Sequence, residues 1–385
     1  MPHRLVYLDN AATTFPKPPK VLEAMFSKYA ELGVSPGRGS YDLAVQAGDA
    51  VAEARQKVAR FFGALDPDRV IFAANATDAL NLASHGLLRP GDHVVSTVLE
   101  HNSVLRPLHH FRERGWISYD LAPCNGQGFV DPAEIAARIQ PNTRLVVVTH
   151  ASNVLGTVQP IQEIGRRCAE RAVPLLVDVS QSAGIIPLDM AASHVSAIAF
   201  TGHKSLFGPT GIGGLVIHPN LDVQASRFGG TGIDSRELAH TPTFPHRLEA
   251  GTINLMGILG LSAGLDYILD RGLADIHHHE IQLLTRLRDG LADMTHVEMY
   301  CASSLADHVA VLTLNVQDLN PEDAGAILDA DFDIAVRVGL HCAPLVHRQI
   351  GTLHRGAVRF SPGLFNTSED IDRAIEALAS LSGPA

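Results

Sequence analysis

Lys204 stands among glycines and apolar residues, away from any run of charged side chains. It follows the apolar segment Ala197–Thr201 and precedes the glycine-rich segment Gly208–Gly214. A lysine in a partly desolvated cleft has a lowered pKa, so that its neutral amine can attack a carbonyl carbon. We therefore expect Lys204 to be a lysine that forms a Schiff base.

A carboxylate follows a second apolar segment. Asp178 lies near the end of the stretch Pro174–Val179, and Ser180 and Gln181 come directly after that stretch. The carboxylate could cap the next helix, or it could face a cationic partner in a cleft. Because the rest of the segment is apolar, the carboxylate is expected to be buried, and burial favours a paired charge.

A short polar turn after the segment Arg69–Ala73 is a candidate phosphate site. It opens a helix, so the backbone N–H of Ala76 and the hydroxyl of Thr77 would suit a phosphate. Taken alone, the turn is more simply a helix N-cap formed by Asn75 or Thr77. His101, which follows another apolar run, is on its own only a weak signal of catalysis.

Together these features are more specific than each one alone. An imine-forming lysine, an anionic partner for a pyridinium nitrogen and a phosphate anchor are what pyridoxal phosphate requires. The competing interpretation is a nucleotide-binding α/β protein, but the sequence has no GxGxxG after its first strand and no GxxxxGK[ST] motif. The sequence therefore predicts pyridoxal phosphate as the cofactor.

These side chains can act together only if the segments that carry them form one sheet. Short β-type runs alternate with helical patterns in the middle of the chain, which is typical of parallel βαβ units, and such sheets bind ligands at the carboxyl ends of their strands. The expected strands are Arg69–Ala73, His93–Val98, Arg144–Thr149, Pro174–Val179, Ala197–Thr201 and Gly213–His218. The expected helices are Tyr41–Phe62, Asp78–Leu88, Ser103–Arg114, Asp131–Ile139 and Ile161–Arg171.

The pattern changes to α+β after about residue 255. We predict an α/β fold with a large cofactor-binding domain at residues 16–255, and a smaller domain formed by residues 1–15 and 256–385. The glycine-, threonine- and proline-rich segment Ser226–His246 is expected to be a long functional loop. The elements expected after residue 255 are helices Ile258–Asp270, Ile276–Ala292, Pro321–Leu328 and Ser368–Leu381, and strands Val309–Asn315, Ile334–Arg337 and Ala357–Ser361.

Composition narrows the class of protein. The chain has 385 residues, 46% of them hydrophobic and 18% charged, which is enough for two or three packed domains and excludes general disorder. Its net charge of −11 argues against nucleic acid or an anionic membrane as the main partner. Four scattered cysteines without a CxxC pair argue against a disulfide framework and a zinc site. Without a signal peptide or a long apolar run, we expect a cytoplasmic protein that binds no metal.

Several motifs resemble those of the cysteine desulfurases in the class V aminotransferase group, in the same order along the chain. This resemblance implies a fold-type I pyridoxal-phosphate enzyme, with a mostly parallel sheet flanked by helices and a smaller α+β domain. It also implies a homodimer with shared active sites. The motifs are Tyr7–Thr14, His150–Gly156, Val177–Gln181, Thr201–Lys204, Glu249–Thr252, Arg359–Ser361 and Phe365–Thr367.

The resemblance implies a role for each matching residue. Lys204 would hold the cofactor and move protons at the substrate Cα, and Asp178 would pair with the pyridinium nitrogen. His101 would stack on the ring and Gln181 would bind its phenolic oxygen. The phosphate would be bound by Ala76, Thr77, Thr201, His203 and, from a neighbouring subunit, Thr252. The substrate carboxylate would be bound by Arg359, Asn153, Asn10 and Ala11.

A cysteine decides the activity within this group. The segment Arg337–Leu345 resembles the nucleophile loop of the short-loop desulfurases and selenocysteine lyases, which implies that Cys342 takes up sulfur from L-cysteine as a persulfide. His341 or His347 could take the thiol proton. The other cysteines, Cys124, Cys168 and Cys301, are interpreted as packing residues.

Two departures from the family pattern bear on function. The phosphate turn reads Asn75-Ala76-Thr77-Asp78, which lacks one of the hydroxyl side chains usual in the family. The loop after Cys342 continues Pro344-Leu345-Val346-His347-Arg348, and the chain is shorter than typical members of the group. A sulfur-acceptor protein is expected as a partner, and the sequence does not identify it. Alternatives to a desulfurase are a selenocysteine lyase, another class V lyase or aminotransferase acting on a different amino acid, and a non-catalytic scaffold. The presence of Lys204, Asp178 and His101 together argues against the scaffold.

Overall fold

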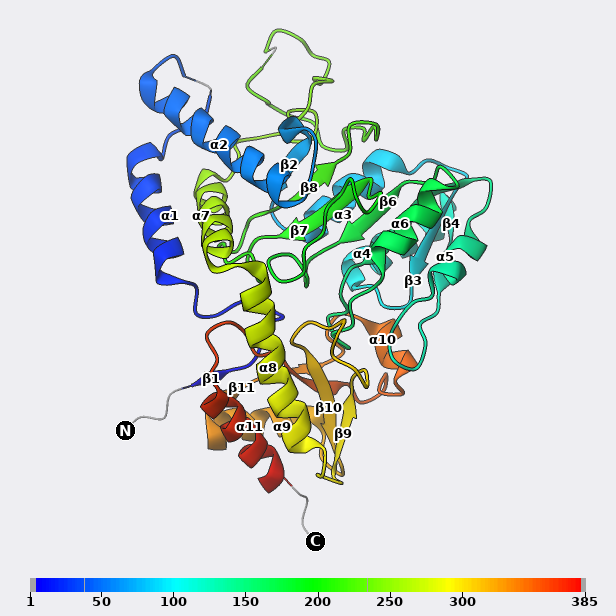
Figure 1. Ribbon diagram of the computed structural model, residues 1–385. Coiled ribbons are helices and arrows are strands. Elements are labelled where there is room, and N and C mark those ends of the chain that lie inside the picture. The colour runs from blue at the N-terminus through cyan, green and yellow to red at the C-terminus, as the bar shows by residue number, and fades with distance from the viewer. Residues whose placement is uncertain (1–4, 38, 234, 382–385) are drawn as a thin grey trace.

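A seven-stranded sheet forms the centre of the larger part of the molecule (Figure 1). The computed structural model describes residues 5–37, 39–233 and 235–381. The strand order is β2-β8-β7-β6-β5-β3-β4, and all neighbours are parallel except β8, which is antiparallel to both β7 and β2. The strands are β2 (Val70–Ala73), β3 (Asp92–Thr97), β4 (Ile117–Ala122), β5 (Thr143–Thr149), β6 (Leu175–Asp178), β7 (Ala197–Thr201) and β8 (Gly213–Ile217).

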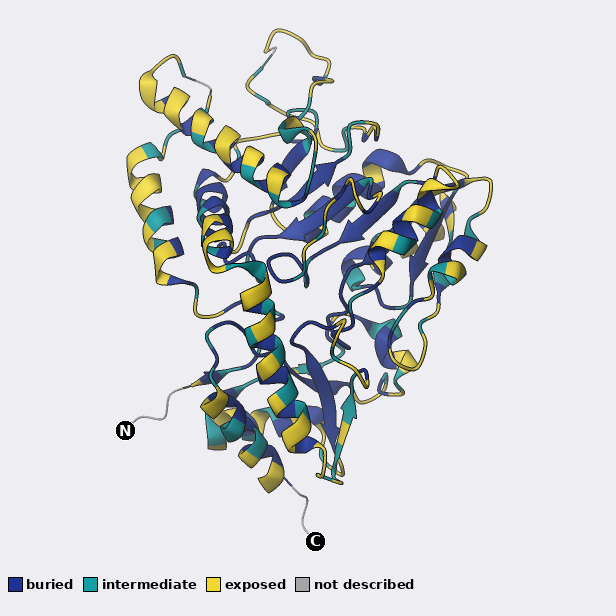
Figure 2. Cartoon of the chain, in the orientation of Figure 1, coloured by how far each residue is buried: buried dark blue, intermediate teal, exposed yellow. Residues whose placement is uncertain are grey.

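Successive side chains along the strands belong alternately to two hydrophobic cores, one on each face of this sheet. On β5, for example, Val146 and Val148 belong to one core, whereas Leu145 and Val147 belong to the other. The predicted α/β class, with its mostly parallel sheet, is confirmed. Figure 2 shows that the strands of this sheet are mostly buried, except for the edge strand β4. The first core is covered by α2 (Asp42–Phe61), α5 (Pro132–Arg138), α6 (Ile161–Ala169) and α7 (Leu255–Arg271), and the second by α3 (Ala76–Leu87) and α4 (Asn102–Glu113).

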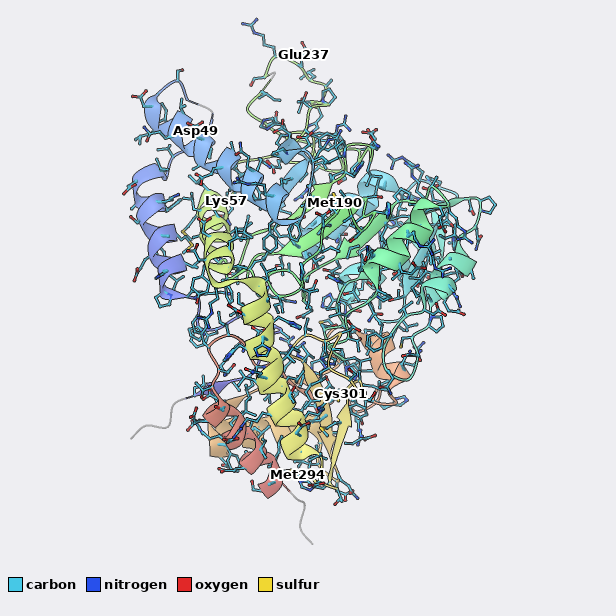
Figure 3. All side chains as sticks on the ribbon, in the orientation of Figure 1. Asp49, Lys57, Met190, Glu237, Met294 and Cys301 are labelled. Atoms are coloured by element: carbon cyan, nitrogen blue, oxygen red, sulfur yellow. The ribbon has the colours of Figure 1, made fainter. Side chains whose placement is uncertain are left out.

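Helix α1 (Pro19–Leu32) was not predicted, and it packs with α2 against α7. Lys57 of α2 forms an ion pair with Asp266 of α7, in which its Nζ lies 2.7 Å from a carboxylate oxygen. Lys57 is labelled in Figure 3. Helix α8 (Leu273–Leu291) follows α7 directly and leads from the large sheet to the small one (Figure 1).

The smaller part of the molecule has a four-stranded antiparallel sheet in the order β12-β13-β10-β9. Its strands are β9 (Val297–Tyr300), β10 (Leu312–Val316), β12 (Arg337–Gly339) and β13 (Ala357–Phe360), and its helices are α9 (Pro321–Phe332), α10 (Pro344–Gln349) and α11 (Ser368–Ser380). The single strand expected at Ile334–Arg337 is wrong: β11 (Ile334–Ala335) pairs with β1 (Val6–Tyr7), and the chain then enters β12 in the other sheet. Strand β10 begins three residues later than expected.

Helix α8 contributes to both cores. Its Ile276 belongs to the core of the large sheet, whereas Leu283 and later buried residues of the helix belong to the core of the small sheet. The domain limits predicted from the sequence remain a prediction. The segment 226–246 has neither helix nor strand among its described residues and projects from the body of the molecule, with Glu237 near its tip (Figure 3). No helix of the described chain is both long and apolar enough to cross a bilayer.

Candidate active site

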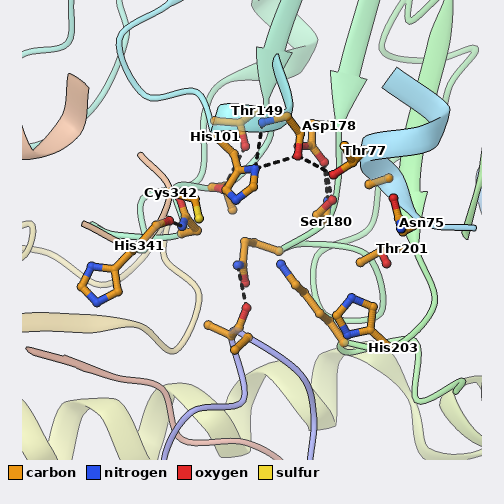
Figure 4. Close-up of a pocket in the computed structure, with 18 of the residues that line it drawn as sticks. Asn75, Thr77, His101, Thr149, Asp178, Ser180, Thr201, His203, His341 and Cys342 are labelled. Carbon is orange, nitrogen blue, oxygen red and sulfur yellow. Dashed lines mark hydrogen bonds between the residues drawn. The ribbon is translucent and has the colours of Figure 1, made fainter. Parts of the chain in front are cut away.

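A cavity of about 290 Å³ lies at the carboxyl ends of β5, β6 and β7, and residues from the smaller part of the molecule complete its wall (Figure 4). The structure brings together here Cys342 and all the predicted cofactor and substrate residues except Asn10 and Thr252. Those present are Ala11, Ala76, Thr77, His101, Asn153, Asp178, Gln181, Thr201, His203, Lys204, Cys342 and Arg359.

Lys204 lies three residues after the end of β7 and lines the cavity. Burial lowers the pKa of its ammonium group to about 8, against the opposing effect of Asp178. Its Nζ has no hydrogen-bond or ion-pair partner in the described chain. An amine with this pKa has a substantial neutral fraction near neutral pH, so Lys204 can act as a nucleophile there.

Asp178 ends β6 and is buried. Its Oδ1 accepts hydrogen bonds from the backbone N–H of Ser180 at 2.9 Å and from the Ser180 hydroxyl at 2.5 Å. Its other oxygen, Oδ2, has no hydrogen-bond partner in the described part of the protein. The carboxylate is therefore oriented by one oxygen and can bind a cationic group in the cavity with the other.

His101 is the N-cap of α4, and Ser103 orients its ring. Nδ1 accepts a hydrogen bond from the backbone N–H of Ser103 at 3.0 Å and lies 2.8 Å from the Ser103 hydroxyl. That hydroxyl is in turn 2.6 Å from Thr77 Oγ1 (Figure 4). Burial lowers the pKa of His101. Because Nδ1 is an acceptor, the neutral ring carries its proton on Nε2.

The predicted phosphate turn is both a helix cap and a candidate anion site. Asn75 caps α3 by accepting a hydrogen bond from Asp78 N at 3.0 Å, and Ala76 and Thr77 follow it at the start of the helix. Gly213 of β8 allows this turn to approach closely, because a Cβ there would lie 2.8 Å from Asn75 Cα. Backbone N–H groups at a helix N-terminus suit a phosphate.

Two buried polar atoms of this cavity lack a partner. Thr201 Oγ1 and His203 Nδ1 make no hydrogen bond within the described chain. Burial lowers the pKa of His203 to about 4, so its ring is neutral at pH 7. Buried polar atoms normally have partners, so these two atoms support a polar ligand at this end of the cavity. The residues present therefore fit the phosphate end of pyridoxal phosphate.

Arg359, on β13, contributes a buried cation to the lining of the cavity. Its Nη2 donates to Asp9 Oδ1 at 2.8 Å, and its Nη1 donates to the Asn153 carbonyl at 3.0 Å. Its Nε has no partner in the described chain. A guanidinium has five N–H groups, so three remain to bind a carboxylate.

Cys342 lies in a turn between β12 and α10 and is exposed. Both His341 and Cys342 have left-handed backbone conformations, with φ of 49° and 56°. Such conformations cost roughly 1–2 kcal/mol for each residue other than glycine. The turn is held by two contacts, from Asn153 Nδ2 to the His341 carbonyl at 2.6 Å and from Asn102 N to the Cys342 carbonyl at 2.7 Å.

The two histidines near Cys342 have a different arrangement from the one expected of a base. His341 Nδ1 is 3.1 Å from His347 Nε2, and His341 Nε2 is 3.3 Å from the Arg337 carbonyl. His347 Nδ1 contacts Thr352 Oγ1 at 2.7 Å. The His341 ring points away from the Cys342 sulfur (Figure 4). All four ring nitrogens therefore have other partners.

Three predicted residues are placed differently from their implied contacts. Gln181 lines the cavity, but its amide donates to the Ala11 carbonyl at 3.0 Å. Asn10 lines a separate small cavity and donates to the Ser361 carbonyl at 3.0 Å. Thr252 is exposed and lines a third cavity, whose floor includes the buried pair Arg55 and Glu249.

Four residues in or beside the cavity have contacts that were not expected from the sequence. Ser103 and Ser180 orient His101 and Asp178, and each lies two residues after its partner, which was a usable signal. Arg337, the register partner of Arg359, lines the mouth of the cavity. Lys17 donates to the His203 carbonyl, and burial lowers its pKa to about 8; no motif marked it.

Known proteins with a similar sequence and fold agree with this interpretation of the cavity. The family model described as aminotransferase class-V matches residues 6–374. A probable cysteine desulfurase of Methanothermobacter thermautotrophicus is 36% identical, over 98% of this chain and 95% of its own. An apo structure of a cysteine desulfurase from Thermococcus onnurineus has a TM-score of 0.90 and 33% identity, covering 98% of this chain and 94% of that one.

A cysteine desulfurase from Escherichia coli, solved in an S-sulfonic acid form, has a TM-score of 0.87 and 27% identity over 98% of this chain and 94% of its own. These matches extend over both the large and the small domain, so they include every element that lines the cavity. The chain therefore belongs to the class-V aminotransferase family and, within it, to the cysteine desulfurases, which are pyridoxal-phosphate-dependent enzymes.

Proposed function

We propose that this enzyme removes sulfur from L-cysteine, releases L-alanine and carries the sulfur as a persulfide on Cys342. The observation that carries the proposal is that an exposed thiol, Cys342, lines the same cavity as Lys204, Asp178 and Arg359. The other three cysteines are buried or half-buried and do not line this cavity.

Three residues of the site, Arg359, Asp178 and Lys204, have roles in binding the substrate and moving its proton. When bound, pyridoxal phosphate supplies an electron sink for the bonds to the substrate Cα. Arg359 binds the substrate carboxylate with its free N–H groups, and Asp178 holds the ring nitrogen protonated. The neutral amine of Lys204 takes and returns the proton at Cα.

Cys342 performs the sulfur transfer. Its thiolate attacks the sulfur of the substrate side chain, so that an S–S bond forms and the carbon–sulfur bond breaks. The electron pair of the broken bond stays with carbon, which is then protonated to give alanine. The thiol of Cys342 and L-cysteine become a persulfide and alanine, and the step needs no external oxidant.

We propose His101, Gln181, Ala76, Thr77, Thr201 and His203 as the remaining cofactor contacts, and Asn153 with the Asn10–Ala11 segment as the remaining substrate contacts. Binding of the cofactor would replace two present contacts. The Thr77 hydroxyl would leave Ser103, and the Gln181 amide would leave the Ala11 carbonyl. The backbone N–H groups at the start of α3 and the orphaned Thr201 and His203 atoms need no such change.

We propose a homodimer in which Thr252 contacts the phosphate bound by the partner subunit. Thr252 is exposed and lies outside the cavity of its own chain. In the nearby segment 226–246, Phe228 and Leu238 are exposed at 73% and 105% of the reference area of the whole residue. These side chains are accessible to a second subunit. Glu249, held by Arg55, fixes the start of the Thr252 segment.

Mixing two inactive variants tests the shared site. Thr252→Glu would repel the phosphate of the partner's site, and Lys204→Ala removes the amine of its own site. If Thr252 acts across the dimer, the mixed dimer contains one intact site and regains activity. If Thr252 acts within its own chain, or not at all, the mixture gains nothing over the sum of its parts.

A sulfur-acceptor protein would reach Cys342 from outside the cavity. A second groove, of about 480 Å³, lies along α3 and α4 and includes Cys342 and Arg106 in its lining. We propose this groove as the side from which an acceptor approaches. A thiol nucleophile that must be reduced for each turnover fits a reducing compartment, and we propose the cytoplasm.

The variant Cys342→Ala tests the proposed function. It should release no alanine or sulfide from L-cysteine, while keeping the visible absorbance of the bound cofactor. Cys301→Ala is the matched control, because its thiol lies outside the cavity, and it should retain full activity. Full desulfurase activity in Cys342→Ala would overturn the proposal.

A further inference from the structure

His347 is a fully buried histidine that does not line the active-site cavity, yet it is connected to the nucleophile loop. It lies on α10, immediately after the turn that carries Cys342. Its Nε2 is 3.1 Å from His341 Nδ1, and its Nδ1 is 2.7 Å from Thr352 Oγ1. The two imidazole rings stack, with centroids 5.3 Å apart and planes 25° apart.

One carbonyl group determines the direction of each hydrogen bond in the series that links Arg337, His341, His347 and Thr352. The Arg337 carbonyl can only accept, so His341 Nε2, at 3.3 Å, carries the proton. In a neutral ring, His341 Nδ1 must then accept, and His347 Nε2 donates to it. His347 Nδ1 accepts in turn, and the hydroxyl of Thr352 donates to it.

Burial is consistent with two neutral rings. It lowers the pKa of His341 to about 3, with the charge of Arg359 adding to the effect, and that of His347 to about 4. Because each Nδ1 lone pair already accepts a hydrogen bond, neither ring has an acceptor for the thiol proton of Cys342. The expectation that one of these histidines is the base for the thiol therefore has no support in the geometry.

The chain of hydrogen bonds instead holds the conformation of the nucleophile. His341 and Cys342 are two consecutive residues with positive φ, and neither is a glycine. Their carbonyls are held by Asn153 and Asn102. The His341 side chain is held at Nε2 by the Arg337 carbonyl and at Nδ1 by His347, which Thr352 holds in turn. Rotation of the His341 ring would release the turn, and with it the position of the Cys342 sulfur.

We propose that His347 and Thr352 are positioning residues, which keep His341 and therefore Cys342 in the left-handed conformation that presents the thiol to the cavity. The inference rests on the proposed role of Cys342 as the nucleophile. Asn153 independently anchors the same turn beside the proposed carboxylate site, because it contacts both the His341 carbonyl and, through its own carbonyl, Arg359. The nucleophile and the carboxylate-binding arginine are thus set by a common residue.

Two matched pairs of variants test this proposal in the enzyme loaded with cofactor. Thr352→Val removes the hydroxyl at nearly constant volume, and Thr352→Ser keeps it. His347→Leu removes the donor to His341, and His347→Gln can restore it through its amide. The readouts are the single-turnover rate of alanine formation, KM for L-cysteine, cofactor absorbance, and the rate at which iodoacetamide alkylates Cys342, followed by mass spectrometry.

We expect Thr352→Val and His347→Leu to lower the single-turnover rate by roughly tenfold to a hundredfold, the range of a small misplacement of a reacting group. KM should change by less than about twofold, cofactor absorbance should remain, and the alkylation rate of Cys342 should change. Thr352→Ser and His347→Gln should recover most of the rate.

Two results would overturn the proposal: an unchanged single-turnover rate in both Thr352→Val and His347→Leu, or a parallel loss of rate, cofactor absorbance and thermal stability, which indicates a merely structural role. Cys342→Ala, measured alongside, separates this inference from the proposed function. If Cys342→Ala stays active, the proposed function fails; if only the His347 and Thr352 variants stay active, this inference alone fails.

Discussion

Asp9 Oδ1 lies 2.8 Å from Arg359 Nη2, so a residue near the N-terminus holds the buried guanidinium of the active site. The segments meet because Asp9 forms a parallel bridge to Ser361, directly after β13. The aspartate balances the charge of an arginine that would otherwise be buried unpaired, and it fixes the plane of the guanidinium. The N-terminal segment therefore supports the arginine of the proposed substrate site.

Arg359→Lys should raise KM for L-cysteine by roughly tenfold to a hundredfold. A lysine keeps the charge but loses the planar fork that can bind Asp9 and a substrate carboxylate together. Steady-state kinetics with cofactor content measured in parallel would check this prediction. Equal KM values for the two proteins would show that Arg359 does not bind the carboxylate.

Asp178→Asn should lower kcat by about a hundredfold, which is typical of losing one preorganised electrostatic group. The asparagine carbonyl can still accept from Ser180, so the side chain should keep its position, but it can no longer hold a protonated ring nitrogen by charge. The measurement is kcat at saturating L-cysteine, with cofactor absorbance as the control for binding. A variant with cofactor bound and normal kcat would contradict the role of Asp178.

Lys204 should set the pH dependence of reconstitution with cofactor. Burial lowers its pKa from 10.5 to about 8, and only the neutral amine reacts with an aldehyde, so the rate should rise about tenfold per pH unit below pH 8 and level off above it. Stopped-flow absorbance on cofactor-free protein measures this profile. A rate that continues to rise up to the ordinary lysine pKa would show that Lys204 is not desolvated.

Removing one partner of the buried pair Arg55 and Glu249 should strongly destabilise the protein. Arg55→Met leaves the Glu249 carboxylate buried without its partner, and we expect a loss of about 3–5 kcal/mol. The double variant Arg55→Met/Glu249→Gln should lose less, because its buried amide is uncharged and can still accept from Phe72 N. Urea unfolding of both variants compares them; equal losses would argue against a charge effect.

The sequence predicted the central sheet well because its strands are short apolar runs that end in polar residues. It missed β4, in which the inner positions Ser118, Tyr119 and Asp120 are polar or amphipathic, because an edge strand needs no continuous apolar pattern. It also missed α10, which has only six residues and is too short to show a helical period.

The cavity residues were predictable to the extent that each follows a strand or belongs to a motif. The direction in which each side chain points could not be predicted from the sequence. His341 and His347 are close to Cys342 in sequence, but the left-handed backbone turns the His341 ring away from the thiol. Gln181 contacts a carbonyl of the N-terminal segment, a long-range contact that strand position alone does not predict.

Mass spectrometry of Cys342 is the most direct test of the sulfur transfer. The wild-type enzyme, loaded with cofactor and exposed to L-cysteine, should show one added sulfur atom on the peptide that contains Cys342, and alanine should form in equal amount. Lys204→Ala should show neither. Alanine formation with an unmodified Cys342, or with the added sulfur on Cys124 or Cys301 instead, would contradict the role of Cys342 as the nucleophile.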